Sequence, residues 1–366
     1  MNDERPVANG GTPGNEQHVA PDREADGNVQ ATGAATTAPD PVLAYANLQP
    51  DDILSSLEDL GFACDGRLLA LNSYENRVYR VGIDSGEPLV VKFYRPSRWS
   101  DAAILEEHSF TQELATQEIP VVAPLRLHGR TLHERGSFRF SVSPYRGGRA
   151  PELDQPELLR QLGRLVARMH LQGELQSFEH RPTVDVDTYV HASRHYLLDH
   201  QFIPAHLVDA YVSIADHLAD DIAGCYERAG RSRSLRLHGD FHPGNVLASG
   251  EQLYIVDLDD TRSGPAMQDL WMFLSGDRNE QQPQLAALLD GYEEFRRFDV
   301  RELHLVEALR TMRIMHYAAW IARRWNDPAF QQAFPWFSSA RYWDEHVLAL
   351  REQAALMQEQ PLEWYP

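Results

Sequence analysis

LHGDFHPGNVL (residues 237–247) and, after a short turn, IVDLDD (residues 255–260) form the stretch that decides the fold of this chain. Each segment joins a short apolar run to a polar loop, a pattern that predicts strand, loop, strand, loop. Asp240 lies in the first loop, Asn245 follows five residues later, and Asp257 comes twelve residues after that. The pattern therefore predicts two carboxylates and one carboxamide at strand–loop junctions.

These three side chains are the set that phosphoryl transfer from ATP requires. One carboxylate orients the attacking hydroxyl, while a carboxamide and a second carboxylate hold Mg²⁺ against the phosphates. The protein-kinase pattern H-R-D-x-x-x-x-N, followed by D-F-G, has the same spacing from aspartate to asparagine. We predict Asp240 and Asp257 as catalytic residues, and Asn245 and Asp257 as ligands of Mg²⁺. Side chains that only cap turns are the alternative, which explains one of the three but not all three.

The same residues carry a resemblance to a known family. His238-Gly239-Asp240 with Asn245 and Asp257 resembles the aminoglycoside phosphotransferase and choline kinase branch of the kinase-like superfamily. Longer stretches resemble the bacterial stress response kinase A proteins, a set of Ser/Thr protein kinases on that fold: LNSYENRVY (71–79), VKFYRP (91–96), GP (264–265) and QDLWM (268–272). The resemblance covers about residues 46–366. It implies a two-lobed protein-kinase-like fold with ATP between the lobes.

A turn in the first half of the chain is expected to meet the ATP phosphates. Residues 67–71 and 77–81 are predicted strands, and Ser73 lies in the NSYEN turn between them. Protein kinases carry a glycine-rich loop at this position. The turn here has no glycine, which departs from that pattern, and an ordinary Asn/Ser turn is the alternative. The resemblance implies that Ser73 hydrogen-bonds phosphate.

A lysine within an apolar strand predicts an anionic partner. Lys92 lies in LVVKFY (89–94), where it needs such a partner or an exit to solvent. Ser100 is expected to cap a helix that reaches about residue 117, and Glu107, unlike Glu106, lies on the apolar stripe of that helix. We predict that Lys92 binds the ATP phosphates and that Glu107 positions it. A lysine on an edge strand and a surface pair of glutamates are the alternatives.

The order of predicted elements gives an α+β fold with a small β-rich N-lobe and a larger, mainly helical C-lobe. Residues 1–44 lack aromatic residues and are expected to form a disordered tail. Residues 45–146 form the predicted N-lobe, in which 121–127 and 138–142 continue the sheet up to a hinge at 143–148. Residues 147–366 form the predicted C-lobe, with apolar helical stripes near 158–169 and 208–222.

Three further acidic residues follow the catalytic segments. Asp259 and Asp260 are expected to cap a turn, although one of them is a candidate for a second Mg²⁺. Asp269 either braces the catalytic loop, as the resemblance implies, or caps a helix.

One predicted helix face near the C-terminus is basic and aromatic. Its members recur at a spacing of 3, 4, 3 and 4 residues: Arg310, Arg313, Tyr317, Trp320 and Arg324. We expect internal salt bridges there, with an anionic or peptide substrate as the alternative.

Composition excludes several classes of protein. The 366 residues carry a net charge of −20, whereas nucleic-acid binders usually show a basic balance or patch. We therefore expect neither a nucleic-acid nor a membrane partner. The sequence has no apolar run long enough to span a membrane and no signal-peptide core behind Met1, so a cytoplasmic protein is expected. A monomer is expected by default.

Taken together, the residues and the resemblance predict a kinase in the cytosolic stress response. It would use ATP and Mg²⁺ to phosphorylate Ser/Thr hydroxyls of protein substrates, with Asp240 as base. A kinase for small alcohols such as choline, homoserine or an aminoglycoside is the first alternative. A nucleotide-binding scaffold without turnover is the second.

Overall fold

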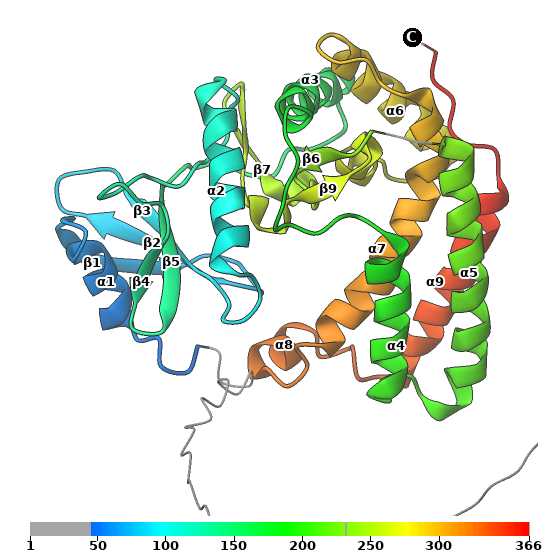
Figure 1. Ribbon diagram of the computed structural model, residues 1–366, viewed down its shortest axis with the longest axis horizontal. Helices are drawn as coiled ribbons and strands as arrows, with labels where there is room; N and C mark the ends of the chain where they lie inside the picture. Colours follow the sequence, from blue (N-terminus) through cyan, green and yellow to red (C-terminus); the bar gives the residue numbers. More distant parts are fainter. Residues whose placement is uncertain (1–44, 231–232, 366) are drawn as a thin grey trace, which may run out of the picture. The chain divides into compact units, whose positions relative to one another are not determined.

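The computed structural model describes residues 45–230 and 233–365, so the predicted tail lies outside the described residues. An antiparallel sheet in the order β1-β2-β3-β5-β4 comes first, and mainly helical chain follows it (Figure 1). The strands of the sheet are β1 (Cys64–Ala70), β2 (Arg77–Ile83), β3 (Leu89–Phe93), β4 (His133–Arg135) and β5 (Phe138–Pro144). Short ladders join β6 (Leu235–Leu237) to β9 (Arg262–Gly264) and β7 (Val246–Ser249) to β8 (Gln252–Ile255).

Helix α1 (Pro50–Glu58) packs against the sheet, and α2 (Asp101–Thr116) links the sheet to the helical part. Ser100 caps α2 as expected, because its side chain accepts the N–H of Ala103 at 3.2 Å. The predicted apolar stripe of α2 is buried and includes Glu107. The same helix contacts both α3 and the turn at residues 258–260, so it connects the sheet to the catalytic segments.

The prediction that residues 121–127 form a strand of the sheet is wrong. Pro120 and Pro124 lack the N–H groups that a strand ladder requires, so this segment makes isolated contacts. Val122 N donates to Ile255 O at 3.0 Å, and Leu125 N donates to Val142 O at 2.7 Å. The segment therefore ties β5 to β8, and the edge strand of the sheet is β4 instead.

The helical part has its own apolar core. Helices α4, α5, α7 and α9 run beside one another in Figure 1, where contacts join them. The helices of this part are α3 (Pro156–Gly173), α4 (Ala192–Asp199), α5 (Val208–Ala229), α6 (Arg278–Glu293), α7 (Val306–Ala322), α8 (Pro328–Ala333) and α9 (Ala340–Gln358). In the part of the chain that the structure describes, none of the helices combines the length and apolar character that a membrane span needs.

Helices α3 and α6 approach closely because glycines face each other across their contact. A Cβ added to Gly163 would lie 2.0 Å from Leu288 O, and one added to Gly291 would lie 2.1 Å from Arg160 O. Both obstacles are backbone atoms, which no side-chain rotation can move. This contact supports α3, whose C-terminal turn carries His170 beneath the catalytic loop.

We expect Gly163→Ala to lower the free energy of unfolding by about 1–3 kcal/mol, because α3 and α6 must move apart. Gly224→Ala is the matched control. Gly224 lies within α5, and an added Cβ there would meet only the end of the Arg228 side chain at 3.4 Å. The control should be neutral or stabilising by up to about 1 kcal/mol. Urea unfolding midpoints measure both, and equal midpoints would contradict the close packing.

Candidate active site

The loop between β6 and β7 carries Asp240 and is held in place by Asp269. The Asp269 side chain is buried, and its two oxygens accept the N–H groups of His238 and Gly239, each at 2.8 Å. His170 Nε2 lies 3.2 Å from the same carboxylate, and burial lowers the pKa of His170, so the ring is neutral. Asp269 therefore braces the catalytic loop rather than capping a helix.

Gly239 lets this loop pass close to the segment after Asp257. It has a φ of +85°, and a Cβ at this position would lie 2.2 Å from Asp260 O. Within the loop, Asn245 Nδ2 donates to Asp240 O at 2.9 Å. The predicted catalytic aspartate and the predicted metal-binding asparagine are thus fixed to each other by one hydrogen bond.

Asp257 follows β8 in the left-handed backbone region, with φ 60° and ψ 61°. Residues other than glycine populate this region sparsely, and such positions cluster at functional sites. The side chain is 51% exposed, and its Oδ1 lies 3.5 Å from Lys92 Nζ. Desolvation raises the pKa of Asp257, and Lys92 lowers it. The nearby carboxylates of Asp259 and Glu107 raise this pKa further. A cation at this carboxylate would relieve the repulsion.

Lys92 lies among three carboxylates. Its Nζ is 3.3 Å from Glu107 Oε1 and 3.5 Å from an oxygen of Asp257 and of Asp259. Burial alone would lower the pKa of Lys92, but these carboxylates, Glu107 foremost, hold it well above its ordinary value. The predicted contact between Lys92 and Glu107 is confirmed, and the lysine is a cation.

Glu107 also meets a second cation, since Arg181 Nη2 lies 3.2 Å from its Oε2. The neighbouring Glu106 points elsewhere, and its carboxylate accepts the N–H groups of Glu179 and His180 at 2.6 and 2.8 Å. The two adjacent glutamates therefore have separate roles. Glu107 orients Lys92, and Glu106 fixes the segment after α3.

A cavity of about 300 Å³ lies between the sheet and the catalytic segments. Lys92 and Ser73 line it, together with residues 143–146, which were predicted as the hinge. Its apolar walls come from Val78, Val90, Leu247 and Val256. Apolar walls with a few convergent polar groups are typical of small-molecule sites.

A second cavity of about 430 Å³ adjoins the first. Asp240 lines only this second cavity, whereas Ser73, Asn245 and Asp257 line both. The structure therefore brings every predicted site residue to this pair of cavities. The residues between the cavities are those predicted to contact phosphate and metal.

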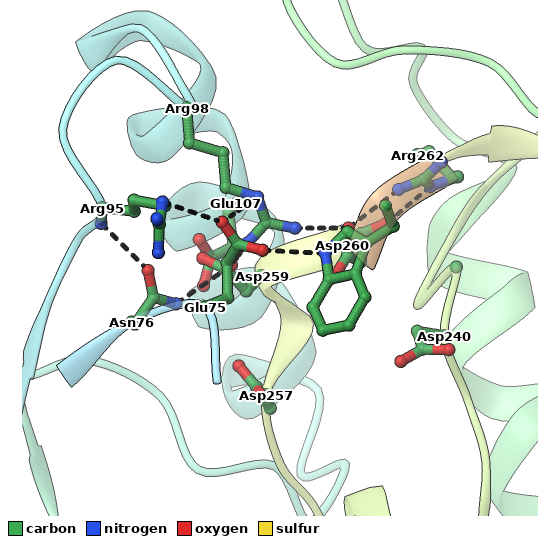
Figure 2. Close-up of polar contacts among 12 residues, drawn as sticks. Glu75, Asn76, Arg95, Arg98, Glu107, Asp240, Asp257, Asp259, Asp260 and Arg262 are labelled. Carbon is green, nitrogen blue, oxygen red and sulfur yellow. Dashed lines mark hydrogen bonds and ion pairs between the residues drawn. The ribbon is translucent and has the colours of Figure 1, made fainter. Parts of the chain in front are cut away.

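The prediction that Asp259 and Asp260 only cap a turn is wrong, because both pair with arginines (Figure 2). Asp259 is buried, forms an ion pair with Arg98, and accepts Asn76 Nδ2 at 3.0 Å. Asp260 lies 2.7 Å from Arg98 Nη2 and 2.9 Å from Arg262 Nη2. An aspartate that caps a turn accepts backbone N–H groups. These two carboxylates bind buried guanidinium groups instead.

The turn at residues 72–76 belongs to the same network. Glu75 lies 2.7 Å from Arg324 Nε and accepts Trp320 Nε1 at 2.8 Å. Arg95, just beyond β3, lies 2.9 Å from Asp327, and its backbone N–H donates to Asn76 Oδ1 at 3.1 Å. The turn is therefore joined to the end of α7 and to the start of α8.

Sequence reasoning missed Glu75, Asn76, Arg95 and Arg98. The run that follows Lys92 signals only Arg95 and Arg98. Asn76, Arg95 and Arg98 each have a partner more than 150 residues away along the chain. Spacing cannot reveal partners at such separations.

The basic-aromatic face divides into residues with different partners. Arg310 pairs with Glu307 at 3.0 Å and Arg324 pairs with Glu75, so the expected internal salt bridges are confirmed for these two. Arg313 instead forms an ion pair with Asp240, the predicted catalytic residue. Arg313, Tyr317 and Trp320 line the second cavity.

Residues 67–306 match the model of the phosphotransferase enzyme family. The chain belongs to this family. Its relatives are named as kinases, so the prediction that the chain is a kinase is confirmed. The matched range includes Ser73, Lys92, Glu107, Asp240, Asn245 and Asp257.

Among its relatives is Stress response kinase A of Escherichia coli (strain K12), which is 43% identical over 322 residues, covering 88% of this chain and 97% of that protein. The serine/threonine protein kinase RdoA of Salmonella typhimurium (strain LT2) is 40% identical over 327 residues, covering 89% and 99%. The predicted resemblance to the stress response kinase A proteins is therefore confirmed.

Solved structures show the same fold at much lower identity. The amicoumacin kinase hAmiN in complex with AMP-PNP, Ca²⁺ and Ami superposes with a TM-score of 0.67 at 17% identity, covering 86% of this chain and 95% of that one. A microcompartment-associated aminopropanol kinase gives 0.61 at 18% identity, covering 84% and 96%. The predicted two-lobed kinase-like fold is confirmed.

We expect Glu107→Gln to lower the rate of phosphoryl transfer roughly 10- to 100-fold, because Lys92 loses the carboxylate that orients it. Glu106→Gln is the matched control, since it changes the neighbouring carboxylate and leaves Lys92 untouched. Its rate should stay within about twofold of the unsubstituted protein. Initial rates at saturating phosphoryl donor measure both. Equal rates for the two variants would show that Lys92 does not depend on Glu107.

Proposed function

We propose that this chain transfers the γ-phosphoryl group of ATP to a Ser or Thr hydroxyl of a protein. One observation carries the proposal: Asp240 faces one cavity, Lys92 faces the adjoining cavity, and Asn245 and Asp257 lie at the border of both. A donor and an acceptor that occupy the two cavities would meet at that border. Because phosphoryl transfer needs little covalent help from protein, such positioning is the main requirement.

The first cavity suits ATP. Its apolar walls accept a planar base, and residues 143–146 offer backbone groups at its rim. Lys92 is held as a cation beside the border, where the phosphates would lie, and Ser73, which lines both cavities, offers a hydroxyl and an N–H. Cationic and hydrogen-bonding groups that stay fixed in place stabilise the charge that develops on a transferred phosphoryl group.

The donor set at the border fits Mg²⁺. Asn245 and Asp257 supply a carboxamide and a carboxylate, which are hard oxygen ligands, and Mg²⁺ commonly takes one or two carboxylates plus substrate phosphates. Within residues 45–230 and 233–365, no group of three His, Cys, Asp or Glu side chains forms a metal site, so the phosphates would complete this one. Bound there, Mg²⁺ would neutralise charge on the β- and γ-phosphates.

Asp240 acts on the acceptor in this proposal. Burial would raise its pKa, but His242 and the Arg313 guanidinium lower the pKa of Asp240 to about 2. A carboxylate this acidic is a poor proton acceptor in the ground state. Asp240 would therefore hold and orient the acceptor hydroxyl, and would take its proton as the oxygen bonds to phosphorus.

The choice of a protein acceptor rests on the relatives of this chain. They include proteins named as a stress response kinase and as a serine/threonine protein kinase, each matched over nearly its full length. We therefore propose a role for this chain in the stress response. A cytoplasmic monomer without a nucleic-acid or membrane partner stays a prediction from the sequence.

The test uses purified protein, radiolabelled ATP and Mg²⁺, with a generic basic protein and a panel of small alcohols as acceptors. We expect Asp240→Asn to lower the rate of protein labelling roughly 10²- to 10⁴-fold. Asp257→Asn should also lower it and should raise the Mg²⁺ concentration needed for half-maximal rate. Asp220→Asn, at an exposed position of α5, is the control and should act like the unsubstituted protein.

Label that appears only on a small alcohol would contradict the protein acceptor and keep the phosphotransfer site. Full activity of Asp240→Asn would contradict the site itself.

A further inference from the structure

Three arginines line the acceptor cavity beside five carboxylates, and the charges of the arginines are unequally balanced. Arg98 and Arg262 both line it and are neutralised by Asp259 and Asp260. Arg313 also lines it, but its ion-pair partner is Asp240. The positive charge nearest the reacting centre is therefore balanced only by the group that must receive the acceptor.

Asp240 contacts Arg313 through Oδ1, and His242 approaches the other oxygen. His242 Nδ1 accepts the N–H of Gly244 at 3.0 Å, which leaves the ring proton on Nε2. That Nε2 lies 3.6 Å from Asp240 Oδ2. Both oxygens of the catalytic carboxylate are thus approached by donors before any acceptor binds.

An acceptor hydroxyl that donates to Asp240 competes with Arg313 for this carboxylate. The Arg313 side chain is 37% exposed, so its guanidinium can turn away from Asp240 within the cavity. After such a turn, the guanidinium needs another anion to balance its charge. Three of the cavity's other carboxylates, Glu75, Asp259 and Asp260, are already paired with Arg324, Arg98 and Arg262. The fourth, Asp257, lies 3.5 Å from Lys92 and is the proposed ligand of Mg²⁺. An acidic group on the acceptor would therefore supply the new anion.

The rim of the cavity favours a peptide over a small polar alcohol. Tyr74 and Tyr317, 44% and 39% exposed, lie on either side of Phe334, with ring centroids 5.0 and 6.4 Å from it. Exposed aromatic side chains of this kind give contact area to an extended chain at low entropic cost. A cationic acceptor, by contrast, would place its charge beside Arg313.

We propose that the acceptor is an acidic peptide segment, in which Asp or Glu flanks the reacting Ser or Thr, and that Arg313 determines this specificity. The proposal rests on the proposed function and names the class of its substrate. Binding of the flanking carboxylate draws the Arg313 guanidinium from Asp240. The freed carboxylate oxygen then accepts the substrate hydroxyl. The net charge of −20 alone would favour a cationic acceptor. The ion pair of Arg313 with Asp240 lies at the acceptor site itself and favours an acidic one.

The experiment compares kcat/KM for Ser peptides that differ only at the flanking positions, which are Glu, Gln or Lys. The unsubstituted protein should prefer the Glu peptide over the Lys peptide about tenfold or more, the effect of one charge-assisted hydrogen bond. Arg313→Gln should reduce this ratio to about twofold or less, and Arg313→Lys should retain part of it. Arg310→Gln, one turn earlier on α7 and bound to Glu307, should keep the full ratio.

A second acceptor set separates this proposal from the proposed function. It contains paired small alcohols that carry either a carboxylate or an ammonium group near the hydroxyl. If label reaches only these alcohols, the proposal of a protein acceptor is wrong. The ratio of kcat/KM for the carboxylate alcohol to that for the ammonium alcohol, measured in the same variants, then tests whether Arg313 selects acidic acceptors. An unchanged ratio in Arg313→Gln, a preference for Lys peptides, or no labelling of any acceptor would overturn the proposal.

Discussion

The buried carboxylate of Asp259 is the group on which the arrangement of this active site depends. A buried charge is tolerated only when opposite charges and hydrogen bonds surround it. Arg98, Lys92 and Asn76 meet this need from three places in the N-terminal half, and Arg98 foremost holds the pKa of Asp259 below its ordinary value despite burial. Any movement of the sheet away from the catalytic segments would leave these charges unpaired. Electrostatics therefore sets the distance between the two sides of the cavity that we propose for ATP.

The catalytic loop is held by different forces. Asp269 accepts backbone N–H groups of the loop from inside the helical core. The contact between α3 and α6 supports His170, which in turn contacts Asp269. The loop with Asp240 thus belongs to a packed, apolar framework, whereas the turn with Ser73 is attached through ion pairs of Glu75. The ion pairs of Glu75 are largely buried, so salt screens them much less than it screens surface pairs. The two halves of the site consequently differ in the kind of interaction that holds them.

Local charge, rather than bulk charge, shapes the acceptor side. The chain has an excess of acidic residues, and the cavity that contains Asp240 places Arg98, Arg262 and Arg313 beside its five carboxylates. Desolvated, closely spaced groups interact far more strongly than screened surface charges. The chemistry of a bound acceptor is accordingly read from the cavity, and the pairing of Arg313 with Asp240 is its most informative feature.

The sequence by itself determined the fold and predicted a candidate catalytic set. Asp240, Asn245 and Asp257 lie close together along the chain at strand–loop junctions, so spacing and residue type were enough to single them out as candidates. Lys92 and Glu107 were recognisable because a charge on an apolar strand or helix stripe needs a partner. Residues 121–127 were predicted as a strand of the sheet although Pro124 lies within them, and the segment makes isolated backbone contacts instead. The pairs of Arg98 with Asp259 and of Arg313 with Asp240 were decided only by the tertiary structure. Their members are 161 and 73 residues apart, and no local rule of spacing connects side chains that meet only when the chain folds.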